Sequence, residues 1–382
     1  MNQRELRQLI DLAAAERWTE LNLSNKGLTK LPSEIGQLTS LRTLRLFNNQ
    51  LTAVPSEIIQ LTSLTWLSLN SNQLTGVPPE IIHLTSLTTL GLGGNKLTAV
   101  PPEIGQLTSL TELNLYGNKL TAVPPEIGQL INLTSLDQGN NQLTDVPPEI
   151  NQLTSLKELY LNSNQLTAVP PEIGQLTNLM TLNLNSNRLT VLPPEIGQLT
   201  SLRSLDLRDN QLMAVPPEIG QLTSLTALHL YNNKLTSVPP EISQITSLTM
   251  LNLKYNPIQT PPPEVLNLDS QGKADLDGMR RYFRQMAEAA QVRLFEAKLL
   301  IVGEAEAGKT SLARKLQDPA TPLPAPDETT KGVDVHTWEF PLSLISNQLS
   351  VNSSQLPITD DRTLITDHRF RVNIWDFGGQ EI

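Results

Sequence analysis

The chain contains no cysteine, and aromatic residues make up only 4% of its 382 residues. Without cysteine the protein has neither a disulfide framework nor a thiolate metal site, and we expect a reducing, cytoplasmic location. Basic residues are also few, with 28 Lys and Arg against 38 Asp and Glu and a formal net charge of −10. This balance argues against general affinity for nucleic acid or anionic membranes, but it is compatible with a basic partner.

Long hydrophobic runs are missing as well. No run of about 18 apolar residues occurs, so we expect no membrane span. The first residues lack the uninterrupted apolar stretch of a signal peptide. The 4 histidines have no nearby carboxylate or second histidine at ligand spacing, so we assign them no metal or catalytic-triad chemistry.

What the sequence has in abundance is a repeat of 23 residues. The pattern LxxLxLxxNxL begins eleven times, at Trp18, Leu41, Leu64, Leu87, Leu110, Leu133, Leu156, Leu179, Leu202, Leu225 and Leu248. This period and pattern resemble those of leucine-rich repeats. The sequence therefore predicts an α/β solenoid over residues 18–270, in which each unit adds one short strand to a parallel, concave sheet.

Within each unit, apolar residues alternate along the strand, so that Leu44 and Leu46 point into the core while their neighbours face out. The VPPEIGQLTSL segment adds Val and Ile on the convex side, where its prolines disfavour a long α-helix. An asparagine ladder, which we expect to satisfy backbone groups at each turn, comprises Asn49, Asn72, Asn95, Asn118, Asn141, Asn164, Asn187, Asn210, Asn233 and Asn256. Lys26 interrupts the ladder and Gln138 replaces an inward leucine, so we expect a local weakness at each.

Both ends of such an array need a cover, because an open end exposes apolar surface. Residues 1–17 are predicted to form an N-terminal capping helix, whose apolar stripe comprises Leu6, Leu9, Ile10, Ala13 and Ala14. Residues 271–295 are predicted to form a capping or linker helix, with a flexible tether as the alternative. Its stripe comprises Met279, Tyr282, Phe283 and Met286, and we interpret Arg280, Arg281 and Arg284 as a solvated face rather than a basic binding patch.

Outward strand positions form the predicted concave face, roughly 50 Å long for eleven strands about 4.8 Å apart. They carry six aromatic or imidazole rings, at Phe47, Trp66, Tyr116, Tyr160, His229 and Tyr231. Charged residues lie among them, at Glu20, Arg45, Glu112, Asp137, Glu158, Asp206, Arg208 and Lys254. Such rings are enriched at protein interfaces, which predicts a protein or peptide ligand. The alternative is that aromatic residues merely suit strands.

A different motif, GEAEAGKTS, follows the repeats from Gly303 to Ser311. It lies between an apolar run at 298–302 and a helix-forming stretch at 312–317, as expected of a phosphate-binding loop. Gly303 and Gly308 would let the backbone N–H groups point inward to phosphate oxygens. Lys309 would lie between the β and γ phosphates, and Thr310 would offer its hydroxyl to Mg²⁺.

A second phosphate motif lies at the end of the chain. Residues 369–375 are predicted to form a strand that leads into Asp376, Phe377, Gly378, Gly379, Gln380 and Glu381. Asp376 would hold Mg²⁺ through water, the Gly379 N–H would meet the γ-phosphate, and Gln380 would orient the attacking water. Between the motifs, residues 319–331 are too rich in proline for regular structure and predict a mobile loop, and residues 333–340 predict another strand.

Together these motifs make residues 296–382 resemble the first part of a Ras-like P-loop α/β domain. Leucine-rich repeats directly before such a domain resemble the Roco family, in which a Roc GTPase domain precedes a dimerising COR domain. The resemblance implies GTP or GDP with Mg²⁺, and a homodimer through domains beyond this chain. The implied catalytic residues are Lys309 and Gln380, and the implied metal site comprises Thr310, Thr330 and Asp376. The implied nucleotide-binding residues are Gly303, Glu306, Ala307, Gly308, Lys309, Thr310, Ser311, Thr330, Asp376 and Gly379, with Thr329 as the competitor of Thr330.

Some features depart from the family pattern. Ala305 occupies a position that is often glycine in GTPases that accept an external arginine, and residues 341–368 form a long excursion. The sequence ends at Ile382, before the NKxD-type segment that would recognise guanine, so the Roc domain is expected to be incomplete. We therefore expect loose order after about residue 296 and weak nucleotide binding by this chain, because half a domain cannot bury its core.

Two functions remain open from the sequence. The favoured one is a GTP-binding molecular switch with Mg²⁺-dependent hydrolysis in the intact protein, whose concave face selects a protein partner. The alternative is a non-enzymatic interaction scaffold with a truncated, inactive nucleotide domain. An ATP-driven sensor is disfavoured, because proteins of that kind place the nucleotide domain first and lack the DxxGQE motif.

Overall fold

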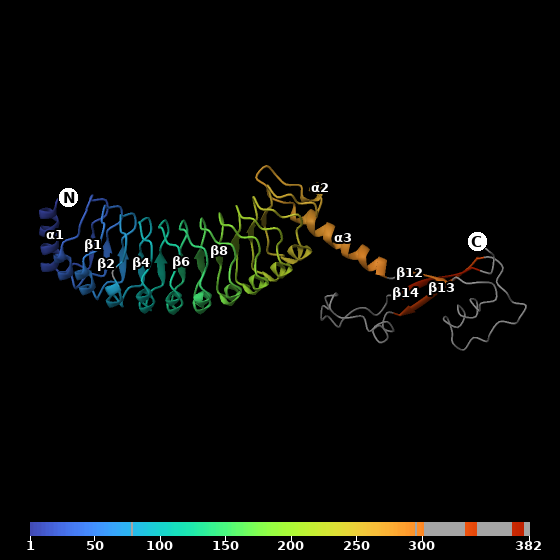
Figure 1. Cartoon of the computed structure of the whole chain (residues 1–382), viewed down its shortest axis with the longest axis horizontal. Helices are drawn as coiled ribbons and strands as arrows, with labels where there is room; N and C mark the ends of the chain where they lie inside the picture. Colours follow the sequence, from blue (N-terminus) through green and yellow to red (C-terminus); the bar gives the residue numbers. More distant parts are fainter. Residues whose placement is uncertain (78, 295, 302–332, 342–368, 378–382) are drawn as a thin grey trace, which may run out of the picture. The chain divides into compact units, whose positions relative to one another are not determined.

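The structure is a computed structural model, and it describes residues 1–77, 79–294, 296–301, 333–341 and 369–377. The chain forms two compact units, Met1–Tyr282 and Phe283–Ile382. The first unit contains the repeats, drawn from blue to yellow in Figure 1. The second unit contains most of a helix and three further strands.

The first unit is built on a parallel sheet of 11 strands that follow the order of the chain. Each strand is three residues long, and its central leucine pairs in register with that of the next strand, as Leu21 does with Leu44. These leucines are buried, whereas the residues on either side face out, so the predicted alternation is confirmed. The strands are β1 Glu20–Asn22, β2 Thr43–Arg45, β3 Trp66–Ser68, β4 Thr89–Gly91, β5 Glu112–Asn114, β6 Ser135–Asp137, β7 Glu158–Tyr160, β8 Thr181–Asn183, β9 Ser204–Asp206, β10 Ala227–His229 and β11 Met250–Asn252.

Short 3₁₀ helices line the other side of the array, in place of long α-helices (Figure 1). A proline in extended conformation precedes nine of these helices, as Pro124 does before η5, which is the effect expected of the PPE sequence. Successive helices pack so closely that a Cβ atom on Gly128 would lie 2.5 Å from the Glu149 carbonyl oxygen, so glycine is needed there. The helices are η1 Ser33–Gln37, η2 Ser56–Gln60, η3 Pro79–His83, η4 Pro102–Gln106, η5 Pro125–Gln129, η6 Pro148–Gln152, η7 Pro171–Gln175, η8 Pro194–Gln198, η9 Pro217–Gln221 and η10 Pro240–Gln244.

The asparagine ladder joins each unit to the one before it. Asn118 is typical: its Oδ1 accepts from the Leu97 N–H at 3.1 Å, and its Nδ2 donates to the carbonyl oxygens of Leu92 and Leu115, both at 3.0 Å. Buried backbone groups that would otherwise be costly are thereby satisfied. The first repeat has no preceding repeat to bond, so the lysine at position 26 removes no hydrogen bond between repeats. The Lys26 backbone N–H instead donates to Asn49 Oδ1 of the next repeat.

Gln138 occupies a core position at which neighbouring units have leucine, and it is 2% exposed. Its backbone keeps the pattern of the sheet, because its N–H donates to the Tyr160 carbonyl oxygen at 2.8 Å and its own carbonyl accepts from Asn141 and Asn164. The expected weakness therefore concerns its side chain rather than the pairing of the strands.

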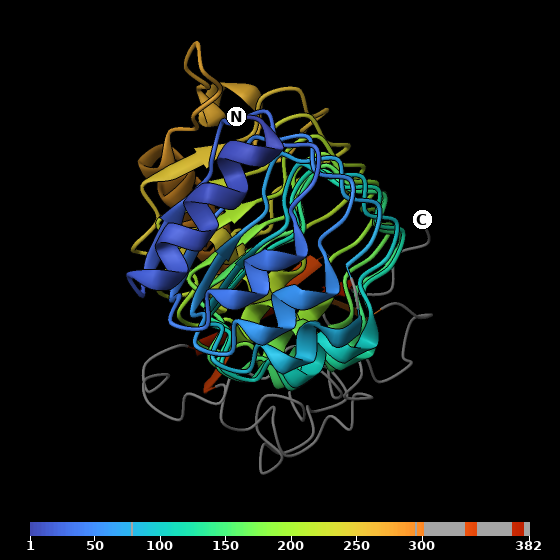
Figure 2. The same ribbon diagram turned by 90° about the vertical axis from the view of Figure 1, so that its left-hand side faces the viewer.

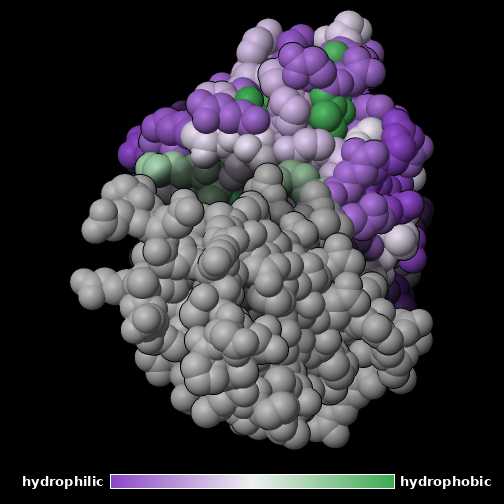
Figure 3. Space-filling view, turned by 90° about the vertical axis from the view of Figure 1, so that its right-hand side faces the viewer, coloured by the Kyte–Doolittle hydropathy of each residue, from purple (hydrophilic) through white to green (hydrophobic). Residues whose placement is uncertain are grey.

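Helices cover both ends of the array. α1 (Gln3–Ala15) begins with a capping box between Asn2 and Glu5 and buries Leu6, Ile10 and Ala13, and Figure 2 shows it across the near end. At the other end, α2 (Pro263–Leu266) buries Leu266, and α3 (Leu276–Leu294) buries Met279 and Phe283. The prediction for Met286 is wrong, since its side chain is 50% exposed. In the described surface that Figure 3 leaves visible, hydrophobic residues occupy only a few small areas.

The segment before α3 also protects the last strand of the array. Leu253 N–H donates to the Gly272 carbonyl oxygen at 3.0 Å, and Ala274 N–H donates to that of Leu251 at 2.8 Å. The edge of β11 is therefore partly paired, which limits its availability for pairing with another chain. Arg280 supports the same end, because its side chain donates to the Ile245 carbonyl oxygen and forms an ion pair with Asp277.

The second unit contains a sheet with strand order β12–β14–β13. β12 (Glu296–Ile301) is parallel to β14 (Arg369–Phe377), and β13 (Val333–Pro341) is antiparallel to β14. Strands are thus present at the three places where the sequence predicts them. In the parallel pair, Ile301 lies opposite Asp376.

Candidate functional site

The strongest candidate site among the described residues is the solvent-facing side of β1–β11, which we call the sheet face. It is formed by the first and third residues of each strand and by the second residue after the strand. Because every strand repeats the same geometry, side chains from successive units stand side by side about 4.8 Å apart. Trp66 and Tyr116 are 40% and 43% exposed here, so these rings are available for contact.

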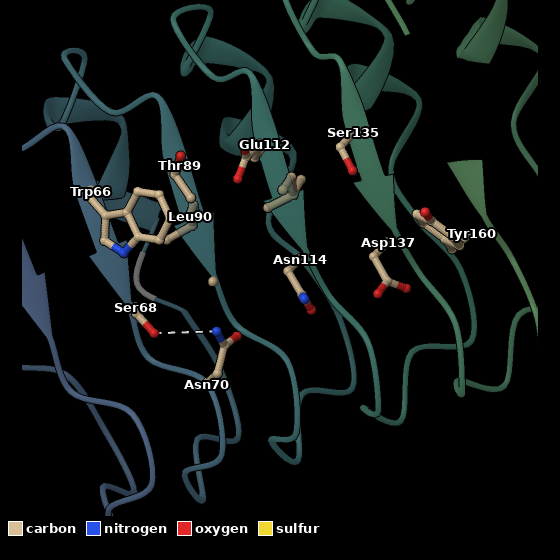
Figure 4. A pocket seen from close by; sticks show the side chains of 12 residues that line it. Trp66, Ser68, Asn70, Thr89, Leu90, Glu112, Asn114, Ser135, Asp137 and Tyr160 are labelled. Carbon is tan, nitrogen blue, oxygen red and sulfur yellow. Dashed lines mark hydrogen bonds between the residues drawn. The ribbon is translucent and has the colours of Figure 1, made fainter. Parts of the chain in front are cut away.

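A hollow of about 230 Å³ lies in the sheet face across β3–β7 (Figure 4). Trp66 and Tyr160 stand at its two ends, with polar side chains between them. Its floor includes Gly91, where the absence of a side chain lowers the surface. The lining comprises Trp66, Ser68, Asn70, Thr89, Leu90, Gly91, Glu112, Leu113, Asn114, Ser135, Asp137 and Tyr160.

The charged groups of this hollow are acidic. Asp137 Oδ1 accepts from the Gly139 N–H at 3.0 Å, and burial raises the pKa of Asp137 above its ordinary value of 3.8, although that hydrogen bond opposes the effect. Beside the hollow, Glu158 Oε2 accepts from the Ser135 hydroxyl at 3.3 Å and from the Tyr160 hydroxyl at 3.4 Å. Burial and then the charge of Glu158 raise the pKa of Tyr160 above 10.0. The hollow thus combines carboxylates with aromatic rings.

A second polar group lies on β9 and β10, further along the sheet face. Arg208 grips Asp206 with two nitrogens, Nε to Oδ1 at 2.9 Å and Nη2 to Oδ2 at 2.6 Å, and Asn185 donates to Oδ2 at 3.3 Å. Burial would raise the pKa of Asp206, but these hydrogen bonds outweigh it and lower the pKa below 3.8. Burial also lowers the pKa of neighbouring His229 below 6.5, against the charge of Asp206. The charges of Asp206 and Arg208 are therefore already paired within the chain.

Tyr255, just after the sheet face of the last repeat, is a residue that the sequence did not single out. Its φ of 58° lies in the left-handed region, which is rare for a bulky side chain. Its ring meets that of Tyr231 edge to face with centroids 5.0 Å apart, and Lys254 Nζ lies 5.2 Å from the Tyr255 centroid. The signal that could have found it is the departure from the repeat, because the equivalent position carries Asn, Ser, Gly or Asp in the other repeats.

The sequence named both aromatic ends of the hollow and its carboxylates, but it missed the small polar residues between them. Ser68, Asn70, Thr89, Asn114 and Ser135 were not singled out. The available signal was the pair of glycines at outward positions 91 and 93, where side chains are missing from a surface that otherwise carries them.

The predicted nucleotide-site residues lie almost entirely outside the described residues. Asp376 is the exception, and its backbone is placed at the carboxyl end of β14. The residues outside are Gly303, Glu306, Ala307, Gly308, Lys309, Thr310, Ser311, Thr329, Thr330, Gly379 and Gln380. The predicted mobile loop at 319–331 also lies there.

Comparison with known proteins settles the family. A family model described as a leucine-rich repeat region matches residues 17–93, 80–188, 125–207 and 171–266. These segments run without a gap from 17 to 266 and cover more than half of the chain. The chain is a leucine-rich repeat protein. With an exposed parallel sheet built from these repeats, it has the fold of a protein-interaction scaffold.

Two curated relatives of this leucine-rich repeat protein are both named Roc-COR-CHAT protease. The one from Runella zeae is 33% identical over 106 residues, which is 27% of this chain and 10% of the relative. The other, from an unknown prokaryotic organism, is 32% identical over 106 residues, or 28% of this chain and 9% of the relative. The chain therefore spans about a tenth of the length of the curated relatives it matches.

Two solved structures are similar to the repeats in both sequence and fold. The crystal structure of a TDR receptor matches with a TM-score of 0.59 and 29% identity, over 65% of this chain and 50% of that one. The crystal structure of PEPR1-AtPEP1 matches with a TM-score of 0.51 and 30% identity, over 59% of this chain and 37% of that one.

The described part of this leucine-rich repeat protein contains neither a candidate membrane-spanning helix nor a candidate metal site. Its helices there include none with the length and apolar character that a membrane crossing requires. The same residues contain no group of three or more His, Asp or Glu side chains placed to hold a metal ion.

Proposed function

We propose that this leucine-rich repeat protein recognises a peptide or protein segment on its sheet face, and that in the intact protein these repeats belong to a GTP-binding molecular switch with Mg²⁺-dependent hydrolysis. The hollow between Trp66 and Tyr160 carries the first half of the proposal. Aromatic side chains exposed beside polar groups are typical of protein interfaces. The similar structures support this half, because one is a TDR receptor and the other is named by two components, PEPR1-AtPEP1.

The register of the small sheet supports the second half. Carboxyl ends of neighbouring parallel strands meet at one edge of a sheet, where ligands bind in α/β folds. Ile301, at the end of β12, lies opposite Asp376 in β14. The predicted phosphate-binding loop begins at Gly303, two residues after Ile301 in the sequence, so it would start at the same edge as Asp376. The two predicted motifs would need that arrangement, and the word Roc in the names of the two curated relatives also supports a Roc domain in the intact protein.

At that edge, each residue of the proposed site has one role. The backbone from Gly303 to Gly308 and the Lys309 ammonium would bind the phosphates, Thr310, Thr330 and Asp376 would hold Mg²⁺, and the Gly379 N–H would contact the γ-phosphate. Gln380 would position the attacking water. The bound metal would neutralise charge that develops on the phosphate oxygens.

Selection from a random peptide library displayed on phage, with the whole chain as bait, tests the recognition half. We expect binding peptides to lose affinity about tenfold or more when Trp66 is replaced by serine, because a large exposed ring is removed. Met213→Ser is the matched control, since Met213 is 61% exposed but lies off the sheet face. A library that yields no peptide sensitive to Trp66→Ser would contradict recognition on this face.

Identification of the nucleotide retained by the longer natural protein tests the switch half. We expect GDP to co-purify with the wild-type protein and to be lost in Lys309→Ala, because the lysine charge contacts the phosphates. Calorimetry on residues 1–382 should show far weaker GTP binding than the longer protein. If the longer protein retains no nucleotide, or retains it equally in the variant, the interaction scaffold alone is the better description.

A further inference from the structure

Asp137 and Asp206 occupy the same position three repeats apart, the third residue of β6 and of β9. Asp206 is held by the guanidinium of Arg208, which stands two residues further along the chain. The residue two positions after Asp137 is Gly139, which has no side chain. One repeat therefore contains a complete aspartate–arginine pair, whereas the other contains only the aspartate.

No residue of the described chain takes the place of the missing arginine. The ion pairs found among the described residues include neither Asp137 nor Glu112. Outward positions of the sheet face from β3 to β8 contain the carboxylates Glu112, Asp137 and Glu158 and no lysine or arginine. Asp137 Oδ2 has no hydrogen bond within the described residues, because only Oδ1 is used, by the Gly139 N–H. An acidic surface of this kind is electrostatically complementary to a cation.

Size and lining restrict what that cation is. The hollow, about 230 Å³, is smaller than the roughly 300–1,000 Å³ of pockets for drug-sized ligands, which suits a single side chain. A metal ion is disfavoured, because the described residues contain no cluster of three ligating side chains. The Tyr160 ring, on the strand next to that of Asp137, favours a group that can stack on an aromatic face (Figure 4). A planar guanidinium both stacks and forms two parallel hydrogen bonds to a carboxylate.

We propose that the hollow between Trp66 and Tyr160 receives an arginine side chain of the bound peptide, with its guanidinium on Asp137 and Glu112. This inference rests on the proposed recognition by the sheet face and names the chemistry that the face selects. The ligand arginine does for Asp137 what Arg208 does for Asp206. Burial raises the pKa of Asp137, and a bound cation would offset that cost by favouring the ionised carboxylate.

The peptides selected from the library supply the first test. We expect arginine to be enriched at one peptide position, and replacement of that arginine by citrulline, its neutral isostere, to weaken binding about tenfold or more. Replacement by lysine should weaken binding less than citrulline does, because the charge is kept. Binding should also weaken as salt concentration rises.

Variants of the protein supply the second test. Asp137→Asn and Glu112→Gln should each weaken the arginine peptide about tenfold and leave the citrulline peptide nearly unchanged. The matched control is Asp145→Asn, which removes one exposed charge from a position off the sheet face and should bind as wild type does. Thermal melting of each variant within a few degrees of the wild type establishes that the fold is intact.

The possible failures can be told apart. Peptides that depend on Trp66 but show no preference for arginine, or that bind equally to Asp137→Asn, would overturn the arginine site and leave recognition on the sheet face standing. A library that gives no peptide dependent on Trp66 would overturn both.

Discussion

Gln138 shows how a repeat protein allows single residues to be judged against equivalent ones. Leu115 and Leu161 hold the same place in the flanking units and are fully buried, and Gln138 is 2% exposed. Its amide makes no hydrogen bond within the described residues, and it is not one of their buried polar atoms that lack a partner, so its polar tip reaches solvent beside a core of leucine. A fully buried amide without a partner would cost roughly 1–3 kcal/mol, and the contact of this amide with solvent lowers that cost.

We expect Gln138→Leu to stabilise the array by about 1 kcal/mol, because it replaces a largely buried polar side chain by the apolar side chain of the flanking repeats. Denaturant midpoints compared with the wild type measure the change. Gln142→Leu is the control, since Gln142 is exposed and its replacement should alter the midpoint little. A Gln138→Leu midpoint at or below that of the wild type would mean that the glutamine is accommodated without cost.

At the scale of elements, the capping helices determine whether the first and last repeats keep their cores covered. α1 covers the N-terminal end with Leu6, Ile10 and Ala13, and its start is fixed by the Asn2–Glu5 capping box. The sequence predicted these three residues because one amphipathic face implies one buried side, whereas Leu9 and Ala14 of the predicted stripe are only partly buried. It did not predict how far the cover extends, so Met286 belongs to the predicted stripe of α3 and yet is half-exposed.

We expect Leu6→Ala to destabilise the N-terminal end by about 2–4 kcal/mol, because it leaves a cavity between α1 and the first repeat. Hydrogen exchange in residues 3–30 measures the loss locally, which suits an array whose ends open independently. Leu12→Ala is the control on the same helix, since Leu12 is 47% exposed. Equal exchange in both variants would show that α1 does not protect the first repeat.

For the whole molecule, the strict 23-residue spacing makes the repeats interchangeable. The strands, the lack of long α-helices on the convex side and the ladder were predictable, because each arises within one repeat or between neighbouring repeats, whereas the 3₁₀ helices themselves were not predicted. The hollow was not, because it depends on which different side chains meet across strands: Trp66, Gly91, Asp137 and Tyr160 come from four units. The sequence likewise placed Asp206 and Arg208 on the sheet face but did not predict that they form an ion pair.

Deletion of residues 179–201, one complete unit, should therefore leave a folded array. In the shortened chain the Leu166 N–H would donate to Asn210 Oδ1, as it donates to Asn187 Oδ1 at 3.1 Å in the full chain. The ladder would therefore continue across the junction. Circular dichroism should show an unchanged spectrum per residue and a melting temperature lower by a few degrees. Deletion of residues 179–189 is the control, because it breaks the period, and equal melting of the two deletions would contradict interchangeable units.

The asparagine ladder also has a consequence for synthesis of the chain on the ribosome. The Leu28 N–H is satisfied by Asn49 and the Leu51 N–H by Asn72, so each of the first ten repeats depends on an amide that lies 21 residues later. While the chain is growing, its youngest repeat always has a backbone donor without its final acceptor. Completion of the array must therefore proceed from the α1 end towards β11, with each newly translated unit closing the one before it.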